Sequence, residues 1–354
     1  MLDITEAHLR QLEHPDLALI CREPDTHNPE IFEPNFFYGH SQILKRAAGL
    51  KEDHPIRAVL EHGINYYTRD FVTRAELEAP LPAFLPNSRK RAAMYKTRSN
   101  GRWVMPVGSP FLYVQEEVDS LLSVPAQRQG TLCFPCHSTR YIHTDFAHET
   151  YAAKLEELPD KFKPVTVCIY WRDYDRGAHI PYQNRGFNIV SCGHMFDPYF
   201  LYRFYLYARR HQYACSNEIG SHLYYAVGSG CRYFHFSSGK IAYSAEKASK
   251  LVLGPMDSDE TLQQTVQTLF GTVSETITPE QQRYVDDELG RNEKKTGPEL
   301  RQILQSLQWR DRFFFLPPLP PEERAFRAVY YRLPAWFQRL KLVKKLFKKR
   351  HKPL

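Results

Sequence analysis

Short apolar segments alternate with helical patterns along most of this chain, and the alternation restricts the fold more than any other feature. In the first part the strand-like segments are residues 56–61, 83–85 and 103–107, with helical patterns at 41–48 and 88–98. In the second part the strand-like segments are 131–134, 165–170, 188–191, 213–215 and 232–236, with helical patterns at 146–157, 198–211 and 219–227. Strands separated by helices of this length form crossovers in parallel sheets. The pattern predicts an α/β fold with two Rossmann-like domains.

The pattern also suggests where the domains divide. It breaks at residues 121–130 (LLSVPAQRQG), and only helical patterns follow Gly254. At 354 residues, 42% of them apolar, the chain exceeds the size of most single cores. We predict an N-terminal domain over 1–125, a second domain over 126–256, a helical segment over 257–316, and a Pro-rich linker with a basic tail over 317–354.

The net charge of +7 is concentrated at the C-terminus. Eleven of the 47 Lys and Arg residues lie from Arg324 onward with no acidic residue, which leaves 36 basic against 40 acidic residues before that point. A nucleic-acid-binding body would carry its basic groups on a folded face, so nucleic acid is not an expected partner.

The basic tail has the pattern of a helix lying on a membrane. In residues 334–349 one helical face carries Trp336, Leu340, Val343 and Phe347, and the lysines lie mostly elsewhere. The predicted membrane contacts are Trp336, Leu340, Lys344, Lys345, Phe347 and Lys348. A solvated tail docked on its own domain is the alternative. With no signal peptide and no apolar window of membrane-spanning length, we expect a cytoplasmic protein, peripheral on the inner face of the membrane.

The seven cysteines are predicted to be buried free thiols, because most lie in or beside apolar strand-like segments. Cys133 and Cys136, followed by His137, match a redox or haem-attachment pattern. Haem attachment requires export, and a redox pair usually opens a helix, so packing is the favoured interpretation.

Two histidines in the first part are candidate general bases. His40 follows Tyr38-Gly39, and His62 comes directly after a strand in Glu61-His62-Gly63. Ligands of open α/β sheets bind at the carboxyl ends of strands, and imidazole titrates near neutral pH. Either histidine could deprotonate an acceptor hydroxyl, or could instead hydrogen-bond a loop backbone.

In the second part, polar residues follow successive strands that would end along one edge of the sheet. Free N–H groups at a helix start bind anions, and an Arg can grip a phosphate, so a phosphate-bearing ligand is expected there. The candidates at this edge are His137, Ser138, Arg172, His194, Ser216 and Asn217, with Ser221 and His222 at the following helix. Each alone could be a helix cap or a satisfied turn residue.

Several common sites are missing. The chain has no Gly-x-x-x-x-Gly-Lys-Ser/Thr loop, no Gly-x-Ser-x-Gly elbow and no His-Glu-x-x-His pair. Gly228 and Gly230 follow a helical pattern and are expected to end it. Asp173 and Asp175 could suggest a metal-dependent transferase, but better-placed groups surround them, so neither a metal nor a cofactor is expected.

The order of motifs resembles bacterial capsule and lipopolysaccharide biosynthesis proteins with the glycosyltransferase B-type fold. The resemblance covers roughly residues 36–236 and rests on YGH, LKRAAGL, EHG, WVMPVGSPFLY, TLCFPCHST, VTVCIYWRD, GHMFDP and SNEIGSHLYYAVGSG. It implies an N-terminal acceptor domain with chemistry near His62-Gly63. It also implies a nucleotide-sugar domain in which His194, Asp197-Pro198 and Ser216-Asn217 bind phosphates. Stricter CMP-sugar transferases have His-Pro and Ser-Ser where this chain has His194-Met195 and Ser216-Asn217.

The leading hypothesis is a metal-independent glycosyltransferase that moves a sugar from a nucleotide-sugar donor to a glycan or lipid-linked glycan acceptor at the membrane face. One alternative is a polyol-phosphate transferase of the teichoic-acid type. Another is a non-catalytic, membrane-associated assembly protein with a degenerate B-type fold.

Overall fold

The structure is a computed structural model and describes residues 4–64, 72–139, 142–237, 241–245 and 260–311. The predicted linker and the membrane-contact residues Trp336, Leu340, Lys344, Lys345, Phe347 and Lys348 lie outside the described residues.

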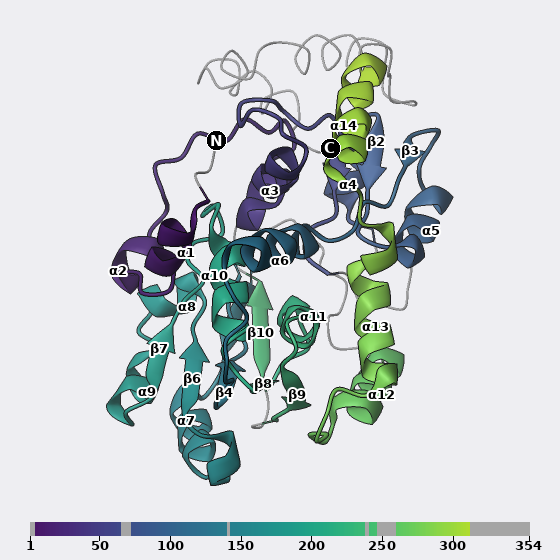
Figure 1. Cartoon of the computed structure of the whole chain (residues 1–354). Helices are drawn as coiled ribbons and strands as arrows, with labels where there is room; N and C mark the ends of the chain where they lie inside the picture. Colours follow the sequence, from purple (N-terminus) through teal and green to yellow (C-terminus); the bar gives the residue numbers. More distant parts are fainter. Residues whose placement is uncertain (1–3, 65–71, 140–141, 238–240, 246–259, 312–354) are drawn as a thin grey trace.

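The first sheet has three parallel strands, β1 (Val59–Leu60), β2 (Ala83–Leu85) and β3 (Trp103–Val104), in the order β1-β2-β3. Val59 pairs with Phe84, and Ala83 pairs with Trp103. The crossovers carry α4 (Arg74–Glu78) and α5 (Arg89–Thr97), while α3 (His40–Ala47) precedes β1. We call this sheet and these helices the N-terminal unit, which lies uppermost in Figure 1.

The second sheet has five parallel strands in the order β7-β6-β4-β8-β9. They are β4 (Thr131–Phe134), β6 (Val165–Cys168), β7 (Asn188–Val190), β8 (Tyr213–Ser216) and β9 (Arg232–His235). The intervening helices are α7 (His148–Glu156), α8 (Trp171–Asp175), α9 (Ile180–Asn184), α10 (Phe200–Ala208) and α11 (Ser221–Gly228). We call this sheet and these helices the C-terminal unit. Its chain order reverses between β4 and β8, which is where open α/β sheets bind ligands.

These two parallel sheets confirm the predicted α/β class, with two Rossmann-like units. The strands of the second sheet match the sequence prediction within three residues, because β4, β6 and β8 are buried along their whole length and read as continuous apolar runs. A two-stranded antiparallel ribbon of β5 (Ile142–Asp145) and β10 (Ala242–Ala245) was not predicted.

Helices from the first predicted domain also pack on the C-terminal unit, so the two units share more segments than the predicted domain boundaries imply. The helices α1 (Glu6–Leu12) and α2 (Leu17–Ile20) belong spatially to the C-terminal unit: α1 packs on α10, and the N–H of His194 donates to Ile20 O. The helix α6 (Pro110–Leu121), capped by Ser109, packs on both α3 and α10. The helices α1 and α2 therefore lie on the C-terminal unit, although they precede the N-terminal unit in the sequence.

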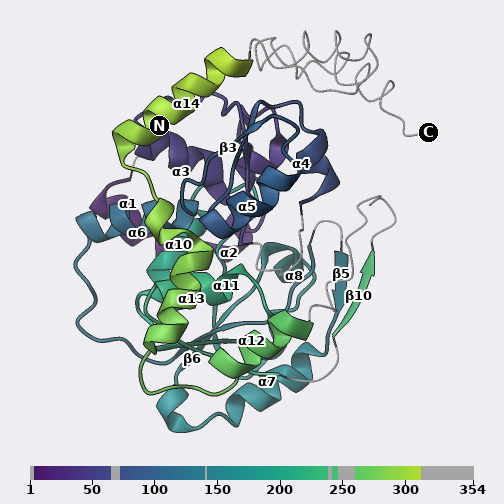
Figure 2. The same ribbon diagram turned by 90° about the vertical axis from the view of Figure 1, so that its right-hand side faces the viewer.

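The last helices run back from one unit to the other. α12 (Glu260–Phe270) and α13 (Pro279–Leu289) cover β9 and α11, and α14 (Gly297–Asp311) continues onto α3 (Figure 2). A Thr278 capping box starts α13, and Gly290, at φ +68°, ends it. One apolar core cluster contains residues of both units, and each unit also has a smaller cluster of its own.

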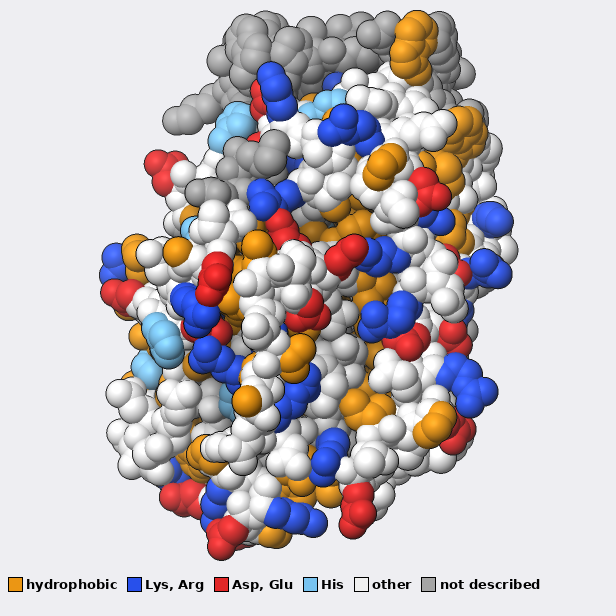
Figure 3. Space-filling view, viewed as in Figure 1, with side chains coloured by type: hydrophobic (Ala, Val, Ile, Leu, Met, Phe, Trp, Pro, Cys, Tyr) orange, Lys and Arg blue, Asp and Glu red, His pale blue; other side chains and the backbone are white. Residues whose placement is uncertain are grey.

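The cysteines are buried as predicted, and the surface carries charges of both signs. On the face seen in Figure 3, basic and acidic side chains are interspersed. All seven cysteines are free and buried, which confirms that prediction; Cys168 Sγ lies 3.7 Å from Cys192 Sγ. Among the described residues no helix combines the length and apolarity needed to cross a bilayer.

Candidate functional site

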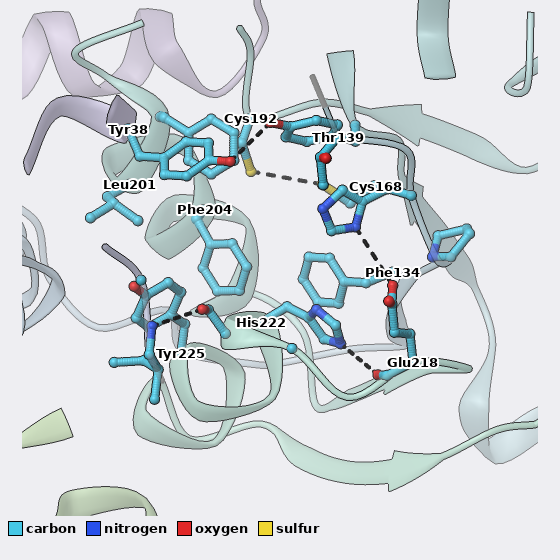
Figure 4. Close-up of a pocket in the computed structure, with 18 of the residues that line it drawn as sticks. Tyr38, Phe134, Thr139, Cys168, Cys192, Leu201, Phe204, Glu218, His222 and Tyr225 are labelled. Atoms are coloured by element: carbon cyan, nitrogen blue, oxygen red, sulfur yellow. Dashed lines mark hydrogen bonds and ion pairs between the residues drawn. The ribbon is translucent and has the colours of Figure 1, made fainter. Parts of the chain in front are cut away.

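A cavity of about 320 Å³ lies where the two units meet, at the carboxyl ends of β4, β6 and β8. The N-terminal unit and the segment before it contribute Tyr38, His62, Gly63 and Ile64. The C-terminal unit contributes Phe134, Pro135, His137, Thr139, Cys168, Ile169, Tyr170, Cys192, Phe200, Leu201, Phe204, Glu218, Ile219, Gly220, Ser221, His222 and Tyr225. In Figure 4 the labelled residues encircle the cavity, with Tyr38 and Glu218 on opposite sides.

The turn after β1, which brings His62 to the cavity, is held in place by hydrogen bonds from neighbouring residues. The buried carboxylate of Glu61 accepts hydrogen bonds from Arg91 Nε at 2.5 Å and from Asn87 N at 2.8 Å. Asn87 Nδ2 in turn donates to Gly63 O at 2.7 Å. The turn is thus held on both sides of His62 by a buried ion pair and an amide.

The same turn contacts the C-terminal unit directly. Gly63 has φ +67°, and a Cβ at this position would lie 3.0 Å from Ser221 Oγ, so glycine suits the close approach. Ile64 N donates to Ser221 Oγ at 2.9 Å. The turn after β1 and the first residue of α11 therefore form one continuous wall.

Tyr38 makes the second link between the units. It lies in the 3-10 helix η1 (Glu33–Gly39) with φ +56°, a conformation that is rare for a bulky residue. Its hydroxyl is 2.9 Å from the Tyr170 hydroxyl, and its ring stacks on His62 with centroids 5.2 Å apart. Strained backbone of this kind concentrates at functional sites, and here it places a phenol beside the candidate base.

Burial keeps His62 neutral at pH 7, because it lowers the pKa of the imidazole to about 4. His40 is more deeply buried, at 1% exposure, and does not line the cavity. Burial and neighbouring His62 lower the pKa of His40 to about 3. Of the two candidate bases, only His62 faces the cavity.

The α11 end of the cavity is formed by the segment that follows β8. Gly220 is the N-cap of α11 and supplies no side-chain oxygen, so the first-turn N–H groups are not capped from that position. His222 stacks on Phe134 at 5.2 Å and pairs with Glu218 O at 3.1 Å. Burial, and then His137, lower the pKa of His222 to about 3.

Ser216 and Asn217 have their side chains turned into the protein. Ser216 Oγ accepts from Glu218 N at 3.1 Å, and Asn217 Oδ1 accepts from Cys136 N at 2.8 Å. The second bond ties the end of β4 to the end of β8 across the reversal of strand order. Both residues shape the site without lining it, whereas Ser221 and His222 line it.

Of the remaining predicted residues, some line the cavity and others do not. His137 lines the cavity; Ser138 is buried, and its N–H donates to Asp173 Oδ2 at 2.8 Å. Arg172 is on α8 and does not line the cavity. Among the described residues no three His, Cys, Asp or Glu side chains are grouped so that they could hold a metal ion.

His194 and Asp197 stabilise the loop before α10. His194 is 3% exposed, packs on Trp171 with ring centroids 4.1 Å apart, and accepts at Nδ1 from Phe196 N at 3.2 Å. Asp197 accepts from Tyr199 N at 2.8 Å and from Arg203 Nη1 at 2.7 Å. Neither residue lines the cavity.

Several lining residues were not predicted from the sequence, chiefly Tyr38, Phe134, Tyr170, Glu218 and Tyr225. A signal existed for Glu218, which follows a central strand of the sheet. None existed for the aromatic residues, since aromatic side chains at these positions are also typical of a core. The described lining residues include one carboxylate and three imidazoles, and no Lys or Arg.

No protein-family model matches this chain, and no curated protein matches its sequence. Among solved structures it is similar to the UDP-GlcNAc 2-epimerase of Methanocaldococcus jannaschii in complex with UDP-GlcNAc and UDP. The TM-score is 0.38 at 11% identity, over 75% of this chain and 73% of that one. The Neisseria meningitidis UDP-GlcNAc 2-epimerase bound to UDP-GlcNAc gives 0.36 at 11%, over 72% and 69% of the two chains. S. aureus MnaA with UDP gives 0.38 at 9%, over 84% and 87%. The ligands in these structures are those of the named proteins. The function of this chain is inferred from its own residues.

Proposed function

We propose that this protein is a metal-independent glycosyltransferase that uses a nucleotide-sugar donor. One observation carries the proposal: neutral His62, after the first strand of one Rossmann-like unit, shares a cavity with the start of α11 at the strand-order reversal of the other. Such a crevice is the usual ligand site of an open α/β sheet, and a helix N-terminus suits a phosphate.

In this mechanism the two walls have different roles. The first-turn N–H groups of α11 and the hydroxyl of Ser221 would hold the donor phosphate, replacing the predicted Ser216 and Asn217. His62 would take the proton of the acceptor hydroxyl as the bond to the sugar forms and the bond to the phosphate breaks. Asp173 already accepts from Ser138 N, so the proposal assigns the Asp-x-Asp no metal.

Binding of candidate donors tests the class of ligand. Purified protein should be stabilised against thermal unfolding by at least one of the UDP-, CMP-, GDP- and CDP-linked sugars, because a ligand that binds only the folded state stabilises it by mass action. CDP-linked polyols in the same screen test the polyol-phosphate alternative. Stabilisation by none of these compounds would favour the non-catalytic assembly role.

We further propose that the acceptor is an envelope glycan, of capsule or lipopolysaccharide, reached at the inner membrane face. The motif order and the basic C-terminal sequence support this. Each Lys or Arg near anionic lipid contributes about 1 kcal/mol, so the tail sequence could hold the protein reversibly. Full-length protein should float with vesicles containing phosphatidylglycerol, and a chain ending at Pro320 should not. Equal flotation of the two chains would contradict the membrane contact.

A further inference from the structure

The last turn of α13 is bonded to the part of the chain that follows β2 and β3. α13 contacts α5, the helix after β2 (Figure 1). The carboxylate of Glu288, which is 2% exposed, pairs with Lys90 Nζ, 198 residues away in the sequence. Leu289 O accepts a hydrogen bond from Ser109 N at 2.8 Å. The end of α13 is therefore held against the unit that carries His62.

Gly290, which ends α13, lies directly against the backbone of Asn87. A Cβ at Gly290 would lie 2.0 Å from Asn87 O and 2.7 Å from Asn87 C, so no side chain fits between the two backbones. Asn87 is 2% exposed, and its carbonyl oxygen also accepts from Gly108 N at 2.9 Å. A group larger than hydrogen at Gly290 would therefore push Asn87 toward its other partners.

Those partners are the residues on either side of His62. Asn87 N donates to Glu61 Oε2 at 2.8 Å, and Asn87 Nδ2 donates to Gly63 O at 2.7 Å. Close-packed interiors transmit such displacements, so a shift of Asn87 would reach both neighbours of His62. A chain of close contacts thus leads from Gly290 through Asn87 to the candidate base.

We propose that Gly290 and Asn87 are positioning residues for His62, so that the end of α13 completes the candidate active site of the N-terminal unit. The inference rests on the proposed function, in which His62 is the general base. A general base must lie within hydrogen-bond reach of the proton that it takes. A misplacement of about 1 Å, even from a distant change, can lower a rate about a hundred-fold.

The donor phosphate would not depend on these contacts. A Cβ at Gly228 would lie 2.9 Å from Leu289 Cδ1, so the end of α13 lies beside the end of α11. The phosphate would lie at the start of α11, near Ser221. A change at Gly290 or Asn87 should therefore affect turnover and not donor affinity.

Two variants test the two links of the chain. Asn87→Asp keeps the size of the side chain and replaces the amide group that donates to Gly63 O with an oxygen, which would repel it. Gly290→Ala introduces the Cβ that would meet Asn87. Each should lower donor turnover per binding site by about ten-fold or more, and change the donor dissociation constant by about two-fold at most. Turnover is followed as release of nucleotide. Calorimetry with the UDP-, CMP-, GDP- or CDP-linked sugar that gives the largest thermal shift measures the dissociation constant and the number of sites.

A spectroscopic measurement reports on His62 without turnover. In protein with isotope-labelled histidine, the His62 ring resonance is assigned by its loss in His62→Gln. This resonance senses the Tyr38 ring, whose centroid lies 5.2 Å from that of the imidazole. It should therefore shift in both Asn87→Asp and Gly290→Ala.

Gly186→Ala is the matched control. Gly186 follows α9 with φ +79°, and a Cβ there would have no neighbour within 4 Å, so this variant adds backbone strain without a new contact. It should change neither turnover nor the His62 resonance. The double variant of Asn87→Asp and Gly290→Ala should be slower than Asn87→Asp by about three-fold at most, because both changes act through one residue.

Wild-type turnover in folded Asn87→Asp would overturn the inference, even where Gly290→Ala does not fold, and so would an unshifted His62 resonance. A loss of donor affinity equal to the loss of turnover would overturn it too, as would losses that multiply in the double variant. These outcomes leave the proposed function intact. A wild-type protein that binds no nucleotide sugar would overturn the proposed function and this inference together.

Discussion

Replacing His62 with Gln should lower the rate of sugar transfer by about a hundred-fold or more, the usual contribution of a general base. Donor affinity should change little, because the α11 N–H groups that would hold the phosphate remain. We expect the loss of rate because His62 faces the cavity on a turn that is fixed by Glu61, Arg91 and Asn87. Rate and donor affinity are measured separately, by turnover at saturating donor and by calorimetry.

The pH dependence of the rate tests whether His62 stays neutral in the working enzyme. Since burial lowers the pKa of His62 to about 4, the wild-type rate should not fall between about pH 7.5 and about pH 5.5. His14→Gln, at an exposed position, is the control and should leave the rate and its pH profile unchanged. A His62→Gln enzyme that keeps more than about a third of the wild-type rate would exclude His62 as the base.

Mild acid should destabilise the protein strongly through the buried His40 and the half-buried His62 and His222. Burial lowers the pKa to about 3 for His40, about 4 for His62 and about 3 for His222, from an ordinary 6.5. Between these values the unfolded chain binds a proton at each site and the folded chain does not. Stability is therefore complete above pH 6.5 and falls as the pH approaches 4. Each histidine costs about 2 kcal/mol between pH 7 and pH 5, about 6 kcal/mol together.

Urea unfolding at pH 7, 6 and 5 measures this loss. Glu76 and Glu288 act in the opposite direction, since burial raises the pKa of both carboxyls, so the measured slope is a sum. His40→Gln isolates one histidine: its free energy of unfolding should fall by about 2 kcal/mol less than that of the wild type between pH 7 and pH 5. Parallel curves for the two proteins would show that His40 is protonated in the folded state.

Most of the architecture was predictable because it depends on local patterns. The strand and helix segments from residue 131 to 236 follow from apolar runs and their spacing. The N-terminal strands β1 and β3 are only two residues long, shorter than predicted. The path of α1 and α2 onto the C-terminal unit was not predicted, since packing partners distant in sequence leave no local signal.

The candidate site was predictable only as a location. Residues at the ends of β1, β4 and β8 do surround one cavity, because the carboxyl ends of parallel strands meet at one edge. Which side chains enter that cavity depends on how each turn satisfies its backbone groups. Ser216, Asn217 and Asp197 accept backbone N–H groups, so their side chains are turned away from a ligand.

The sequence by itself determined the fold class, the edge of each sheet where a ligand would lie, and His62 as one candidate base. Only the tertiary structure separated His62 from His40, brought Tyr38 onto His62, and placed Glu218 inside the cavity. The physical reason is the separation along the sequence between the residues that determine each feature. Helix and strand patterns depend on neighbours a few residues apart, whereas the cavity depends on contacts such as Ile64 with Ser221, which are 157 residues apart.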